Sequence, residues 1–290
     1  MIFAEEWPLM SFTLLSQLAI GMFIILMLIK TTVGSRDSQV SSALKGGFTW
    51  VGPLTIVALI LSVFHLGDPF GAPRSIMNLA SSWLSREIIT AGGFFVLWLV
   101  FWFLLRQGKE SNALGWLTGL VGLAAVFSMA SIYASSVIPA WDNMNTYFSF
   151  FGATFAMGAV GATTALVVGL KGTSIANVLS GLKTAAYLGI LAVVLPLIYL
   201  PVFTSELKGE GATSAASAQV FSESMGLVVG YGGLSLVGIG LLFYGINKGS
   251  KEGNISSGTI YLALGLVIVG QFLGRYLFYA MGIPPMIGTP

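Results

Sequence analysis

The 290-residue chain has no cysteine and a single histidine, His65. The lack of thiolates excludes disulfides, zinc–thiolate sites and ordinary iron–sulfur clusters. One imidazole cannot supply both axial ligands of a haem, and although a His–Met pair is formally available among 11 methionines, Met more often fills apolar packing. We therefore expect neither a haem nor an iron–sulfur cluster in this chain.

Charge is also scarce, because only 8% of the residues are Asp, Glu, Lys or Arg. A soluble domain carries roughly 25%. Hydrophobic residues make up 56% of the chain, and the mean hydropathy is +0.89. A net charge of +2 gives no reason to expect nucleic acid binding. The composition instead predicts an integral membrane protein whose surface faces lipid.

Apolar segments long enough to cross a bilayer recur eight times. In lipid each must be a helix, because only a helix pairs the backbone groups within its own segment. The first charges are Glu5 and Glu6, and a cleavable signal peptide opens with basic residues, so we expect the first segment to stay as a span. We predict an all-α polytopic bundle forming one domain, 1–290, with spans near 9–29, 47–66, 88–105, 113–135, 147–169, 184–204, 225–246 and 257–281.

The sequence also predicts the structure of two connections and the closeness of helix packing. Pro73 suits the first turn of a short interfacial helix between spans two and three, with an apolar face that includes Trp83 and Glu87. The segment 205–223 is polar and rich in Ala and Ser, which indicates a loop. Many of the 37 glycines fall within spans, where they favour close helix packing.

Basic residues predict the orientation, because they are retained in cytoplasmic loops. Nine of the 13 Lys and Arg residues belong to the odd-numbered loops: Lys30, Arg36, Lys45, Arg106, Lys109, Lys171, Lys183, Lys248 and Lys251. With eight spans, both termini should then lie outside, in the periplasm of a Gram-negative cell. The expected location is the inner, cytoplasmic membrane.

Two ionisable residues, His65 and Glu87, fall at the outer edge of the membrane, at the end of span two and the start of span three. A quinol must lose two protons as it loses two electrons. An imidazole that titrates near neutrality can accept a hydrogen bond from a quinol hydroxyl, and a carboxylate can take up a proton and pass it to water. These residues are therefore candidates for quinol oxidation.

Purely structural roles are an alternative for His65 and Glu87. His65 could only cap a helix end, and Glu87 could only neutralise Arg86 or Arg74. Arg275 lies roughly 9 Å below the outer end of the last span at 1.5 Å per residue, where it could snorkel outward, pair with Glu87 or bind a quinone carbonyl.

Two further polar residues on this side favour ordinary roles. Asp142 suits a loop turn or a helix cap, and Tyr133 suits the interfacial belt of aromatic residues.

Two segments resemble a known family. His65-Leu66-Gly67-Asp68-Pro69, followed by Ser81-Ser82-Trp83-Leu84-Ser85-Arg86-Glu87, is similar to the membrane-anchor subunit of anaerobic dimethyl sulfoxide (DMSO) reductase, and the segment 274–279 resembles its last span. The resemblance extends over the whole chain. The family often has an acidic residue before the last-span Gly-Arg, where this chain has Gln271.

The resemblance implies a role in anaerobic respiration and electron transport. The anchor would carry no haem, bind and oxidise menaquinol, and pass electrons to an iron–sulfur subunit and then to a molybdopterin catalytic subunit. The chain would thus be the quinol-oxidising part of an oxidoreductase complex and not its terminal catalytic subunit. The important histidine and glutamate of the family match His65 and Glu87, and Arg275 is a further candidate quinol ligand.

Other functions fit the same composition. A secondary transporter would also have Gly-rich spans, but transporters usually place polar groups near the bilayer midplane, whereas here they gather at one edge. A purely structural anchor without a quinol site is a second alternative. A third is the anchor of a polysulfide- or nitrite-type reductase, which would keep the quinol chemistry and change the terminal acceptor.

Overall fold

A computed structural model describes residues 2–33, 37–65, 77–170, 174–209 and 211–285, with the side chains of 2–5, 65 and 209 left out of the description. These ranges contain nine α-helices and a 3-10 helix, Ala176–Val178, and no strand. The α-helices are α1 (Ile2–Val33), α2 (Ser38–His65), α4 (Trp83–Arg106), α5 (Asn112–Ala134), α6 (Met144–Leu170), α7 (Leu179–Gly209), α8 (Ala212–Glu223), α9 (Met225–Glu252) and α10 (Ser257–Ala280).

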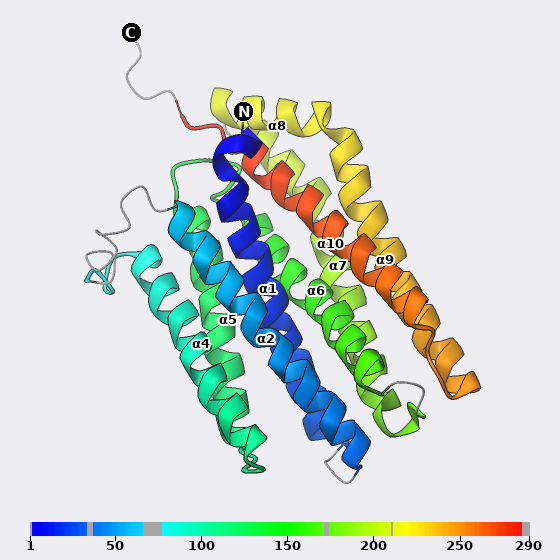
Figure 1. Ribbon diagram of the computed structural model, residues 1–290. Coiled ribbons are helices and arrows are strands. Elements are labelled where there is room, and N and C mark those ends of the chain that lie inside the picture. Colours follow the sequence, from blue (N-terminus) through cyan, green and yellow to red (C-terminus); the bar gives the residue numbers. More distant parts are fainter. Residues whose placement is uncertain (1, 34–36, 66–76, 171–173, 210, 286–290) are drawn as a thin grey trace.

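Eight of these helices are long and apolar enough to cross a membrane, which confirms the predicted all-α bundle of eight spans. Only α8 is too short. α1 begins and α10 ends at the same end of the bundle, which we call the termini end, and α8 lies across it (Figure 1). The helices extend beyond the predicted apolar segments at several boundaries, because a helix continues through the headgroup region after its apolar residues end.

Helices α1 and α6 form the centre of the bundle, and they are the most buried spans. Helices α4 and α5 pack on one side of them, and α9 and α10 on the other (Figure 1). The central pair approaches closely because Gly21 and Gly158 face each other, so that a Cβ on Gly21 would meet the carbonyl oxygen of Thr154. Small residues at such contacts let helix backbones pack directly in lipid.

The connection 205–223 was wrongly predicted to be a loop. Helix α7 continues to Gly209, and the Ala-rich segment after Gly211 forms α8. This helix buries Ser214, Ser217 and Phe221, and the Ser217 hydroxyl donates to the carbonyl oxygen of Met281 at 2.8 Å. Polar composition concealed a helix that is stabilised by packing against α7 and the end of α10.

The predicted interfacial helix lies largely in 66–76, outside the described residues. Residues 77–81 form turns, and α4 begins at Trp83 after the Ser82 hydroxyl accepts from the backbone N–H of Ser85 at 3.3 Å. Trp83 and Glu87 therefore belong to the first turns of a membrane span. An interfacial helix remains a prediction for the rest of this connection.

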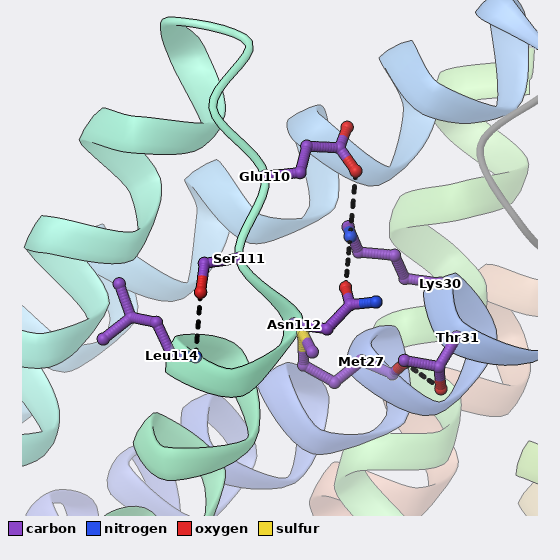
Figure 2. A network of polar contacts seen from close by, with 7 residues as sticks. All are labelled: Met27, Lys30, Thr31, Glu110, Ser111, Asn112 and Leu114. Atoms are coloured by element: carbon purple, nitrogen blue, oxygen red, sulfur yellow. Dashed lines mark hydrogen bonds and ion pairs between the residues drawn. The ribbon is translucent and has the colours of Figure 1, made fainter.

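The opposite end of the bundle is held by a polar network around Lys30, in the last turn of α1. Its buried ammonium group lies 2.9 Å from the Glu110 carboxylate and donates to the Asn112 side-chain oxygen at 2.7 Å (Figure 2). Both partners come from the start of α5 and the turn before it. The network thus fixes the α4–α5 connection to the central helix.

A second polar contact at this end lies at the start of helix α2. The Asp37 carboxylate accepts from the backbone N–H of Gln39 at 2.8 Å and from the Asn177 side chain at 2.7 Å. These hydrogen bonds, the one from Asn177 first, hold the pKa of Asp37 below its ordinary value. The carboxylate thereby caps α2 and ties it to the segment before α7.

Candidate functional site

Glu87 lies in the wall of a cavity of about 430 Å³ between α1, α2, α4 and α5. The cavity is at the termini end, because there α1 and α4 begin and α2 and α5 end. Its lining is Leu9, Phe12, Leu59, Ser62, Leu84, Glu87, Ile88, Ala91, Ile132 and Tyr133. A mostly apolar cleft of several hundred Å³ with a few polar groups has the size and character of a small-molecule site. We call it the Glu87 cavity.

Glu87 is 7% exposed, although it is one turn from the start of α4. The alternative that it only neutralises Arg86 is not seen. The Arg86 guanidinium donates to the carbonyl oxygens of Leu79 and Ala80 and lies 4.1 Å from the centre of the Trp83 ring. Arg74, the other suggested partner, is outside the described residues. The carboxylate is thus available to a molecule in the cavity.

His65 is the last residue of α2, three residues beyond Ser62, which lines the Glu87 cavity. The backbone of α2 therefore reaches the same end of the bundle as Glu87. The His65 side chain lies outside the described residues, so its hydrogen bond to a quinol stays a prediction.

Tyr133 was expected to be an ordinary belt aromatic, but it is buried and lines the Glu87 cavity. Its hydroxyl lies 2.6 Å from the hydroxyl of Tyr279, on α10, and its ring packs edge-on against Trp141 and Phe278. The position of Tyr133 near the end of a span is typical of a belt residue. Contacts with the connection after α5 and with residues of α6 and α10 enclose it.

Glu6 is a second residue that the sequence did not single out as a site. It lies in the second turn of α1, at the termini end, with one carboxylate oxygen buried and without a hydrogen-bond partner among the described residues. It interacts electrostatically with Tyr279. An acidic residue at the start of an apolar span was the available signal.

Arg275 is buried, 3% exposed, and does not snorkel outward. One of its terminal nitrogens donates to the Gln17 side-chain oxygen at 2.8 Å, and its guanidinium lies 3.7 Å from the centre of the Phe150 ring. It forms no ion pair with Glu87 in the described part of the protein, and it lines a different cavity. A direct contact between Arg275 and quinol stays a prediction. The position of Arg275 outside the Glu87 cavity does not support it.

Asp142 is exposed, and its backbone N–H donates to the carbonyl oxygen of Ile138 within a turn, consistent with the structural role expected for it. Among the described residues, no three His, Cys, Asp or Glu side chains gather as metal ligands would. The polar groups of the Glu87 cavity are hydroxyls and a carboxylate. They can exchange hydrogen bonds and protons with a bound molecule.

Comparisons with known proteins cover nearly the whole sequence. The family described as DMSO reductase anchor subunit (DmsC) matches residues 3–281. The anaerobic dimethyl sulfoxide reductase protein YnfH of Escherichia coli K12 is 27% identical over 288 residues, which are 96% of this chain and 95% of the relative. A second anaerobic dimethyl sulfoxide reductase subunit of the same organism is 29% identical over 290 residues, 96% and 95% of the two proteins. Its counterpart from Haemophilus influenzae is 26% identical over 280 residues, 95% and 94% of the two proteins.

Proposed function

Because the chain belongs to the family of DMSO reductase membrane-anchor subunits, we propose that it binds and oxidises menaquinol in the Glu87 cavity and passes the electrons to a partner iron–sulfur subunit. The observation that carries this proposal is a buried carboxylate in the wall of an apolar cavity of about 430 Å³. Such a cavity has room for a fused aromatic ring, and its location at the edge of the span region leaves the isoprenoid tail in lipid.

The proposed reaction converts menaquinol to menaquinone, with the release of two protons and two electrons. Glu87 accepts the proton of one hydroxyl and passes it to water at the termini end. His65 accepts a hydrogen bond from the other hydroxyl and takes up its proton as the ring is oxidised. Tyr133, which faces the same cavity from α5, can donate to a quinone oxygen as the ring becomes oxidised.

The electrons have to leave this subunit, because it has no cysteine to hold an iron–sulfur cluster. We propose that an iron–sulfur subunit docks on the termini end beside the 66–82 connection and hands the electrons to a molybdopterin catalytic subunit. The distribution of basic residues supports an inner-membrane protein with both termini in the periplasm.

Glu87→Gln tests the proton role. The amide keeps the size of the side group but cannot take up a proton, so menaquinol-dependent reductase activity of the assembled complex should fall by about a hundredfold, within the usual range for a lost acid–base group. An artificial donor that reduces the iron–sulfur subunit directly should support an unchanged rate. Gln39→Glu exchanges an amide and a carboxylate at an exposed position and serves as the matched control. Menaquinol-dependent activity equal to that of the unaltered complex would refute the role of Glu87.

A further inference from the structure

The buried guanidinium of Arg275 is short of hydrogen-bond partners. Its Nε and Nη1 atoms are buried and have no partner among the described residues, and the single hydrogen bond of the group goes to the neutral amide of Gln17. Buried donors are almost always paired. The three N–H bonds of these two nitrogens therefore indicate a bound species that supplies acceptors.

The positive charge also has no ion-pair partner within the described ranges. The ion pairs found there join Lys30 to Glu110 and Lys248 to Glu252, and neither includes Arg275. The groups that interact with it electrostatically are the hydroxyls of three tyrosines, Tyr279, Tyr133 and Tyr231. The Phe150 ring offsets part of the desolvation cost through a cation–π contact. The cost of burying an unpaired ion exceeds the stabilisation from such a contact.

Arg275 is one of the residues that line a small cavity. The cavity has a volume of about 40 Å³, and its polar lining consists of Arg275, Asn145, Ser149, Tyr231 and Gln271. Every one of these residues can donate a hydrogen bond from its side group, and none carries a negative charge. A water molecule needs about 10–15 Å³ of such space, so the cavity has room for a few water-sized particles and is far too small for a quinone ring.

We propose that this cavity binds one small inorganic monoanion, of the size and chemistry of chloride, as the counter-charge of Arg275. Water could satisfy the unpaired N–H bonds of Nε and Nη1 but could not neutralise the ion. An anion does both, and the amide, hydroxyl and phenol donors around it complete its coordination. The site is separate from the Glu87 cavity and does not depend on the proposed quinol chemistry.

Helix geometry provides a sharp test. Gln271 precedes Arg275 by four residues, so their side groups are neighbours on the same face of α10. A carboxylate at 271 would supply a fixed counter-charge and displace the anion. Gln271→Glu should therefore abolish anion binding while keeping the arginine, and Arg275→Gln should abolish it by removing the cation.

The measurement is equilibrium binding of radiolabelled chloride to the purified intact complex, in a background of gluconate. The unaltered complex should bind one saturable chloride more per anchor subunit than either variant, and affinity at this site should fall at least about tenfold in both. Gln39→Glu makes the same chemical change at an exposed position and should leave binding unchanged. Equal binding in the unaltered and Gln271→Glu complexes, or no saturable chloride in the unaltered complex, would overturn the proposal.

Discussion

Tyr133 and Tyr279 connect the Glu87 cavity to the buried Arg275. Their hydroxyls lie 2.6 Å apart, and each tyrosine interacts electrostatically with both Glu87 and Arg275. Because both rings are confined by aromatic packing, the hydrogen bond between them orients the Tyr133 hydroxyl. Tyr279 is thus a positioning residue for a hydroxyl in the wall of the cavity.

Tyr279→Phe should weaken the binding of a menaquinone analogue to the purified complex by about threefold to tenfold. The variant keeps the ring but removes one hydrogen bond, which is worth about 0.5–1.5 kcal/mol. A fluorescence-quenching titration measures the affinity. Tyr244→Phe removes a hydroxyl from an exposed ring and serves as the matched control. An unchanged affinity in the Tyr279 variant would show that Tyr133 needs no such orientation.

At this scale the sequence predicted only part of the site. Glu87 could be chosen as a candidate site residue because an acidic residue at the start of an apolar span is costly and rare. The Tyr133–Tyr279 and Gln17–Arg275 contacts join residues 146 and 258 positions apart, and no local pattern reports which helix faces meet. Arg275 was expected to be able to reach outward, but the packing of α10 against α1 and α6 encloses it.

At the scale of single helices, the Lys30 network determines how α4 and α5 attach to the centre. Lys30 is buried, whereas the exposed pair between Lys248 and Glu252 lies along the surface of α9 with 3.8 Å between its charged atoms. Surface pairs of this kind contribute about 0.3–0.5 kcal/mol. The two lysines therefore provide a matched comparison between a tertiary ionic contact and a solvated one.

Lys30→Met should lower the free energy of unfolding by about 2 kcal/mol, because it leaves the Asn112 oxygen and a partly exposed Glu110 carboxylate without their charged donor. Lys248→Met should cost less than about 0.5 kcal/mol. Thermal unfolding of the two variants in the same detergent gives the comparison. Equal losses of stability would mean that the network around Lys30 does not hold the connection.

The helices could be predicted from the sequence where the bilayer requires a helix. The eight spans follow from apolar length alone, since a bilayer leaves no alternative to helices. Helix α8 was missed because its residues are polar and small, and it is identified as a packed helix only through contacts such as the one between Ser217 and Met281. A hydropathy profile contains no information about tertiary contacts of that kind.

At the scale of the whole molecule, the positions of the basic residues and the arrangement of the helices predict the same orientation in the membrane. The termini end carries the Glu87 cavity and α8, and the opposite end carries Lys30 and the start of α5. The rule that positive residues remain cytoplasmic predicts that the Glu87 cavity faces the periplasm. Protons released there and electrons withdrawn on the same side would move little charge across the membrane.

Single cysteines test this orientation without background, because the natural sequence has none. In intact spheroplasts an impermeant thiol reagent should label Ser222→Cys, on the exposed face of α8. Lys109→Cys, in the α4–α5 connection, should be labelled only after the membrane is permeabilised. The reverse pattern would place the termini end in the cytoplasm and would require a different docking side for the iron–sulfur subunit.

The most direct test of quinol oxidation in the Glu87 cavity is to fill that cavity without changing its ionisable groups. Ala91 lies one turn beyond Glu87 on α4 and lines the cavity, whereas Ala124 is exposed on α5. A titration of the intact complex with a menaquinone analogue should give at least about tenfold weaker binding for Ala91→Leu and unchanged binding for Ala124→Leu. Full affinity in the Ala91→Leu complex would mean that quinol binds elsewhere.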